Sequence, residues 1–425
     1  MTRKLIASAL LVSLLSACGS EKHTVTVTEG TVVTEPDHNV ELSVGRLAVN
    51  FADSSDISII DLETNQLLDE ITLTNPASAL YTSPEGRYLV AIQRNFDTVE
   101  FIDGGIFLEA HNDHFDLIEN APSAVSFELL ESKPTHYVPS DEHALIFFDG
   151  DRESSADAGF ALFSDEGINE GKLTAEHHFE TYQHGTGQIR GDFVISTLRD
   201  TNSDSTLPET IALFEMHDDH FHQDQTFTDQ CPGLHGSFQT EEYIAFACTD
   251  GVVKIKQEGD LFTSSKIANP ESMPEGVRIG KFIGSHESNT LIGLSRGGVF
   301  TVNLDNDEIS PFQWQADGVT NYLAYAQTGN DEAIVVLDDV GFINVFEQEN
   351  DWQLAKRFQV LDTIEQETTA QLIANKAKEI IYLVYGERLI NIDLEADTAS
   401  EIFTFEQPVN KAAWLGAMEQ HEHDH

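Results

Sequence analysis

The stretch SALYTSPEGRYLVAIQRNFDTVEFID, residues 78–103, decides the fold. It contains three short runs rich in apolar and β-branched residues, and Pro84 and Gly86 mark the turn between the first two. The same pattern returns six more times, and successive copies begin 43 to 57 residues apart. Repeats of this length with several strands each are typical of propeller blades. The sequence therefore predicts an all-β fold, a single β-propeller.

The two ends of the repeat array complete each other. Residues 45–73 supply three strands without a preceding inner strand, and residues 410–418 (NKAAWLGAM) supply an inner-type strand without followers. Pairing these N- and C-terminal strands closes the ring with one shared blade. We predict eight blades, with seven as the alternative, in one large propeller domain over residues 44–418.

Residues 1–18 have the pattern of a lipoprotein signal peptide. Basic residues near the start precede a short apolar run, and Leu-Ser-Ala-Cys ends the segment at Cys18. We expect cleavage before Cys18 and a lipid on its thiol; the alternative is an ordinary signal peptide. Residues 19–43 would form a flexible tether. This predicts a bacterial envelope lipoprotein, and Gly19 after the cysteine favours the outer membrane, facing the periplasm.

The charge balance excludes one class of partner. Lys and Arg number 23 against 73 Asp and Glu, which gives a formal net charge of −50. Such a surface repels nucleic acid and anionic headgroups and concentrates cations. We therefore expect no nucleic-acid function, and attachment to a membrane through the lipid only.

Three histidines open the inner strands of three successive repeats: His136 in PTHYVP, His184 in YQHGTG and His235 in GLHGSF. In a propeller, equivalent positions on neighbouring blades stand side by side around the central channel. We therefore expect the three imidazole groups to meet at the channel mouth. The alternative is that each histidine is structural and bonds to strand carbonyls.

Carboxylates follow the return strands of the same repeats, namely Asp149, Asp200 and Asp250. A return strand ends level with the start of the inner strand because the two are antiparallel neighbours. Neutral imidazoles with one carboxylate are a ligand set suited to zinc, and a further carboxylate can fix a histidine tautomer. We predict a zinc site of the three histidines and Asp149, supported by Asp250 and Asp200.

Cys231 and Cys248 are the other two thiols, and both flank the inner hairpin of one repeat. In an oxidising compartment a close pair is expected to form a disulfide. This bridge would clamp the segment that presents His235. Two unrelated buried thiols are the alternative.

The remaining histidine groups have weaker assignments. We interpret HNDHFDL (111–117) and HDDHFHQ (217–223) as polar turns after outer-strand runs, with a weak metal site as the alternative. The tail HEHDH can capture metal transiently, or be a solvated acidic end or part of a tag. The tail histidines are His421, His423 and His425.

The QHG start, the CPGLHG start and the following ACTDGV, in an exported β-propeller with His/Asp-rich segments, resemble the AztD family of periplasmic zinc metallochaperones. The resemblance implies a zinc-binding propeller with its ligands near the channel mouth. By motif match it carries the ligand role to His136, His184 and His235, and to Asp149. It also implies a partner, the periplasmic zinc-binding protein of an ABC importer.

These observations predict a lipid-anchored, zinc-binding propeller that buffers or delivers zinc and is not an enzyme. Two alternatives remain. A propeller can act as an envelope scaffold without metal, and a metal-bound water at the channel histidines would make a metal-dependent hydrolase.

Overall fold

A computed structural model describes residues 40–111, 114–140 and 142–418. The predicted signal peptide, the lipidated Cys18 and the tail histidines therefore lie outside the described residues. The chain divides into two compact units, and each is described by itself. The smaller comprises Met1–Val40 and Ala110–Asp116, and the larger comprises Glu41–Glu109 and Leu117–His425.

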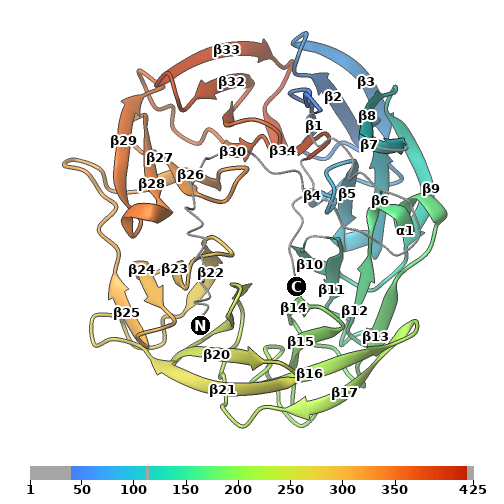
Figure 1. The fold of residues 1–425 in the computed structure, drawn as a ribbon, viewed down its shortest axis with the longest axis vertical. Helices are drawn as coiled ribbons and strands as arrows, with labels where there is room; N and C mark the ends of the chain where they lie inside the picture. The colour runs from blue at the N-terminus through green and yellow to red at the C-terminus, as the bar shows by residue number, and fades with distance from the viewer. Residues whose placement is uncertain (1–39, 112–113, 141, 419–425) are drawn as a thin grey trace, which may run out of the picture. The chain divides into compact units, whose positions relative to one another are not determined.

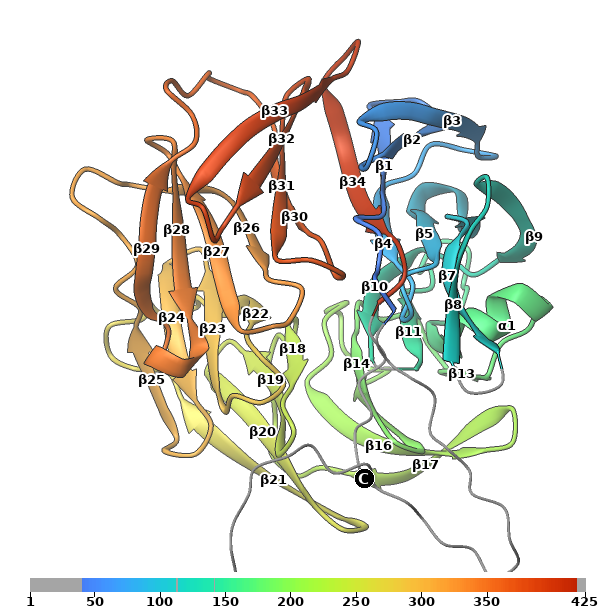
Figure 2. The same cartoon turned by 45° about the horizontal axis from the view of Figure 1, so that its top comes forward.

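The larger unit is a β-propeller with eight four-stranded blades among its described residues, which confirms the predicted fold and blade count. Figure 1 shows the ring of blades face-on, and Figure 2 shows the same strands turned by 45°. Within each blade the strands run antiparallel from the inner to the outer edge, and each is hydrogen-bonded to the next. Repeats that stack radially in this way leave only short sheet edges.

The strands of the first five blades are given from the inner edge outward. Blade 1 has β34 (Val409–Leu415), β1 (Arg46–Phe51), β2 (Asp56–Asp61) and β3 (Gln66–Thr72), and blade 2 has β4 (Ala79–Thr82), β5 (Tyr88–Gln93), β6 (Thr98–Asp103) and β9 (Ser123–Leu129). Blade 3 has β10 (Pro134–Pro139), β11 (Ala144–Phe148), β12 (Gly159–Phe163) and β13 (Ala175–His178). Blade 4 has β14 (Gly187–Arg190), β15 (Phe193–Leu198), β16 (Thr210–His217) and β17 (His220–Thr226), and blade 5 has β18 (Ser237–Gln239), β19 (Tyr243–Cys248), β20 (Gly251–Glu258) and β21 (Leu261–Ala268).

The last three blades follow His235 in the sequence. Blade 6 has β22 (Ile279–Ile283), β23 (Thr290–Ser295), β24 (Gly298–Asn303) and β25 (Glu308–Pro311), and blade 7 has β26 (Tyr322–Gln327), β27 (Ala333–Asp338), β28 (Phe342–Glu347) and β29 (Gln353–Gln359). Blade 8 has β30 (Ala370–Ala374), β31 (Ile380–Tyr385), β32 (Arg388–Asp393) and β33 (Thr398–Thr404).

The first blade is built from both ends of the propeller. Strand β34 pairs antiparallel with β1, and Leu47 lies opposite Trp414 in the register. The side chain of Trp414 is 1% exposed, and its indole N–H donates to the carbonyl of Val44 at 2.9 Å. This confirms the predicted closure of the ring by the terminal strands.

The second strand of each blade carries the core. All residues of β5, β11, β19 and β27 are buried, because each of these strands is covered on both faces by the neighbouring blades. Strands buried on both faces read as continuous apolar runs rather than as alternating ones. The outermost strands are largely exposed, as β3 shows.

Three kinds of feature depart from the regular repeat: a small separate sheet, a short helix and two 3-10 turns. Strands β7 (Ile106–His111) and β8 (His114–Glu119) form a separate two-stranded sheet. The run before residues 111–117 was expected to be an outer strand of a blade, and that expectation was wrong. A short helix, α1 (Asp165–Glu170), connects β12 to β13, and the 3-10 turns η1 (Arg94–Phe96) and η2 (Gln348–Asn350) follow β5 and β28. No helix among the described residues is long and apolar enough to cross a bilayer.

Candidate metal centre

His136 lies within the innermost strand of blade 3. In β10 it pairs with Phe147 of β11, and the register shifts between Pro134 and His136. A bulge of this kind re-aims the side chains beside it. The ring of His136 therefore leaves the blade close to the rings of the two following blades.

His184 and His235 occupy the segments that lead into the inner strands of blades 4 and 5, just before β14 and β18. A glycine follows each histidine because the backbone there packs closely against neighbouring residues and leaves no room for a side chain. A Cβ on Gly185 would come within 2.2 Å of the Thr197 hydroxyl, and a Cβ on Gly236 within 2.9 Å of the Gly280 carbonyl. The HG pairs in the sequence thus reflect close packing at the inner edge.

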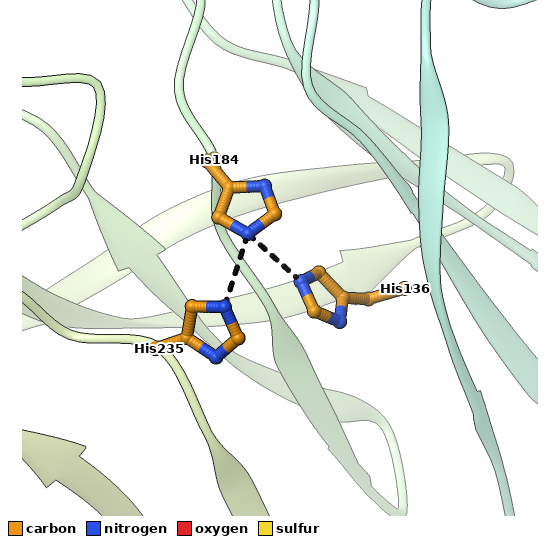
Figure 3. A group of neighbouring side chains, drawn as sticks. All are labelled: His136, His184 and His235. Carbon is orange, nitrogen blue, oxygen red and sulfur yellow. Dashed lines mark hydrogen bonds between the residues drawn. The ribbon is translucent and has the colours of Figure 1, made fainter. Parts of the chain in front are cut away.

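The three imidazole groups converge, as Figure 3 shows. The Nε2 atom of His184 lies 3.4 Å from Nε2 of His136 and 3.4 Å from Nε2 of His235. One ring nitrogen from each of the three lies within 4.8 Å of the others. Two histidine nitrogens bound to one tetrahedral zinc are separated by about 3.3 Å, given zinc–nitrogen bonds near 2 Å. The spacing of the rings therefore fits a shared zinc ion.

The Nδ1 atoms of two rings have partners that set the tautomer. Nδ1 of His184 lies 2.9 Å from Oδ2 of Asp149, and Nδ1 of His235 lies 3.1 Å from the carbonyl of Gly280. Both partners accept a hydrogen bond, so each Nδ1 carries the proton and each Nε2 keeps its lone pair. A ring nitrogen held in this way is oriented and more basic toward a metal.

Asp149 was predicted as a metal ligand, but its carboxylate lies on the Nδ1 side of His184 and not among the converging Nε2 atoms, so it supports that ring instead. Arg94, which follows β5 in the neighbouring blade, donates to Oδ2 of Asp149 at 2.7 Å and to the carbonyl of Lys133 at 3.1 Å. The other carboxylate oxygen, Oδ1, is buried and has no hydrogen-bond partner among the residues that the structure describes. A buried acceptor without a donor is costly.

Burial keeps His136 and His235 neutral. Burial and, to a smaller extent, the neighbouring His184 lower the pKa of His136 to about 4. Burial also lowers the pKa of His235, against the carbonyl of Gly280, which raises it. Neutral imidazoles are the form that binds metal, so these two rings are ready for a cation at neutral pH without first losing a proton.

The supporting role predicted for Asp200 and Asp250 is corrected by their contacts. Asp200 accepts from the backbone N–H of Asn202 at 2.8 Å, and Asp250 accepts from the ammonium of Lys266. Neither carboxylate bonds to a histidine of this site among the described residues. Arg94 and the carbonyl of Gly280 take part instead. Sequence reasoning missed both because they come from adjacent blades and carry no motif of their own.

Cys231 and Cys248 form a disulfide, as expected, with Cα atoms 4.8 Å apart. Both residues are fully buried. The bridge ties the segment before β18 to the end of β19, and the backbone N–H of His235 donates to the carbonyl of Ala247 at 3.2 Å in the same hairpin. The covalent link therefore restrains the loop from which His235 projects.

Replacing both cysteines by alanine is expected to lower the free energy of unfolding by about 3 kcal/mol, because the bridge closes a loop over a sequence separation of 17. Urea unfolding of the parent and the variant measures the change. The parent unfolded in a reducing agent serves as the control and should match the variant. Equal midpoints for the parent with and without reductant would contradict this expectation.

Asp149→Asn is expected to weaken zinc binding by about 10- to 100-fold, since the amide keeps the shape but loses the charge that holds the His184 ring. Zinc titration against a competing chelator gives the affinity. Asp250→Asn is the matched control, because it changes the equivalent position after β19, where the partner is Lys266. Equal losses of zinc affinity in the two variants would show that the effect comes from removing one negative charge and not from the contact between Asp149 and His184.

The other histidine groups are placed as follows. In the smaller unit, Asp116 lies 3.3 Å from Nδ1 of His111 and 3.4 Å from Nε2 of His114, and the three offer ligand atoms within 4.8 Å of one another. The segment 217–223 forms the tight hairpin between β16 and β17, as predicted, with Asp218 in the left-handed conformation.

Together the fold and the site define a β-propeller with a three-histidine centre at the inner edge of blades 3, 4 and 5. No known protein-family model matches the chain. The zinc chaperone AztD of Citrobacter koseri is 24% identical to it over 270 residues, which is 63% of this chain and 59% of that protein. The matched part thus spans less than two thirds of the curated relative.

Two solved structures of Citrobacter koseri AztD, one of them of the apo protein, share the fold. Their TM-scores are 0.72 and 0.71, with 19% and 20% sequence identity, over 89% and 88% of this chain and 99% of theirs. The resemblance to the AztD family that the sequence predicts is therefore confirmed in both sequence and fold. That relative is named a zinc chaperone.

Proposed function

We propose that the protein binds zinc at the inner edge of its propeller and buffers or delivers it. The observation that carries this proposal is the meeting of three Nε2 atoms at distances that suit one tetrahedral zinc. The zinc named for the curated relative supports the same cation. Zinc is the cargo here, and His136, His184 and His235 are its ligands.

The arrangement suits reversible binding. Three neutral imidazoles leave one position of a tetrahedron open, which a water or an incoming ligand can take. The rings are half-buried, so a donor or acceptor of metal can reach them. A ligand entering the open position can displace the histidines in turn, and release then needs no unfolding. The net charge of −50 raises the local concentration of cations around the site.

The setting we propose is the bacterial envelope. In this proposal the predicted lipoprotein signal anchors the chain to the outer membrane through Cys18, and the propeller faces the periplasm. The natural recipient is then a periplasmic zinc-binding protein of an ABC importer, as the family resemblance implies. Fractionation of envelopes after labelling with a lipid precursor tests the anchor, and a soluble, unlabelled chain would overturn it.

The function is tested by titrating zinc into the purified chain with a competing chelator. We expect one tightly held zinc per chain, with a dissociation constant well below micromolar, which an added apo acceptor of higher affinity removes in full. Binding weaker than micromolar would favour a metal-free scaffold. Zinc-dependent turnover of ester or lactone substrates would favour the hydrolase instead.

A further inference from the structure

A second group of imidazoles lies on the outer rim of blades 3 and 4, where one hydrogen-bonded bridge joins the two sheets. Strand β13 runs parallel to β17, with Glu176 opposite His220 (Figure 1). Residues opposite each other in a parallel pair project from the same face of the sheet, and so do residues two apart along a strand. His178 and His222 therefore share the face of Glu176 and His220.

The burial pattern shows that this is the solvent-exposed face of the two strands. Glu176, His178, His220 and His222 are exposed, whereas Phe221 between the last two is 4% exposed and packs in the core. In the antiparallel hairpin of blade 4, His217 lies opposite His220 and adds a fourth ring to the same face. We call this surface the outer imidazole patch; it comprises Glu131, Glu176, His178, His217, His220 and His222.

Two rings of the patch are already at the separation of shared metal ligands. Nε2 of His220 lies 3.1 Å from Nε2 of His222, close to the value of about 3.3 Å for two nitrogens on one tetrahedral zinc. Nδ1 of His220 lies 3.2 Å from the carboxylate of Asp219, which fixes the ring from behind. The ring of His217 has its centroid 5.0 Å from that of His222.

The other half of the patch adds carboxylates. Nε2 of His178 lies 3.9 Å from a carboxylate oxygen of Glu131 and 3.9 Å from one of Glu176, and ligand atoms of the three lie within 4.8 Å of one another. The side chain of Glu131 is 28% exposed, so its charge is partly shielded from water. Imidazole and carboxylate together select borderline divalent ions such as zinc over calcium or magnesium.

We propose that the outer imidazole patch is a second metal-binding surface that takes zinc-like divalent cations at two neighbouring points, the group of His178, Glu131 and Glu176 and the pair of His220 and His222. This surface does not depend on the histidines at the inner edge, and it goes beyond the single-site function proposed above. Its rings are about half exposed, so water competes and exchange is faster than at the inner edge. It suits collection of metal at the surface of an acidic protein.

The test uses the full chain in a background that lacks the other candidate imidazole ligands, with alanine at His136, His184 and His235, at His111 and His114, and at the three tail histidines. Zinc alone is the probe, and bound metal per chain is measured by equilibrium dialysis. The background chain is expected to bind at least one zinc. Adding H178A, H220A and H222A is expected to weaken that binding at least tenfold, and circular dichroism checks the fold.

A matched control removes two imidazoles elsewhere, with H143A and H286A in the same background, and is expected to leave the binding unchanged. Equal losses in control and patch variants, or no zinc bound by the background chain, would overturn the proposal. The patch variant with an intact inner edge separates the two proposals. It should keep one tight zinc if the inner site is functional, whatever happens at the patch.

Discussion

Replacing His136, His184 and His235 together by alanine is expected to weaken tight zinc binding by at least about a thousandfold. Loss of a single group that only supports a ligand costs 10- to 100-fold, so loss of all three ligands costs more. Each change removes a half-buried ring and leaves the strands of the three blades intact. Chelator competition at constant pH measures the affinity of parent and variant.

The control for this experiment removes the same number of histidines as the inner-edge variant. A triple alanine variant at His217, His220 and His222 removes three exposed imidazoles from the outer rim and should keep the tight zinc. The thermal midpoint of both variants should lie close to that of the parent. Unchanged zinc affinity in the inner-edge variant would show that the three-histidine centre is not the binding site.

The stability of the protein is expected to fall by up to about 4 kcal/mol between about pH 4 and pH 7 because of one carboxyl group. Burial at the start of α1 raises the pKa of Asp165 from its ordinary value of 3.8 to about 7, even though Ser83 donates to it at 2.7 Å. The side chain is 3% exposed.

The sign follows from proton binding. Between the ordinary pKa and the raised one, the folded protein holds a proton on Asp165 that the unfolded chain has released. The free energy of unfolding therefore falls as the pH rises through this window. The stabilisation is fully present below about pH 4 and is lost above about pH 7.

Asp165→Asn removes the titration and keeps an acceptor for the N–H of Glu85, which lies 3.3 Å from Oδ1 in the parent. The variant should show a flatter dependence of unfolding free energy on pH, measured by urea unfolding at closely spaced pH values. Asp204→Asn, at an exposed position, controls for loss of one charge from a protein of net charge −50. Parallel curves for parent and Asp165→Asn would refute the assignment.

Much of the fold is predictable because a blade is a local pattern. Each repeat carries its own strand periodicity and turn residues, and the second strands are apolar throughout because both faces are covered. Residues 78–103 therefore predicted three strands of blade 2, and NKAAWLGAM predicted the closing strand β34. The inserted sheet of β7 and β8 was not predicted, since its runs have the same composition as blade strands.

For the candidate site, the repeat register predicted that His136, His184 and His235 open neighbouring blades, and the structure brings them together. The roles of the aspartates depended on more than register. Asp149 and Asp250 both follow second strands, yet one meets His184 and Arg94 and the other meets Lys266. The difference arises from side chains of adjacent blades, and no local pattern records them.

By itself, then, the sequence determined the all-β repeat, the closure of the ring, the cysteine pair and the three inner histidines, because these follow from periodicity and order along the chain. Only the tertiary structure decided which nitrogen of each ring is free and which carboxylate supports it. It also joined the runs AEHH and HFH on one face through the single bridge of Glu176 and His220. Contacts between blades depend on how neighbouring sheets pack, and packing is a property of the whole ring.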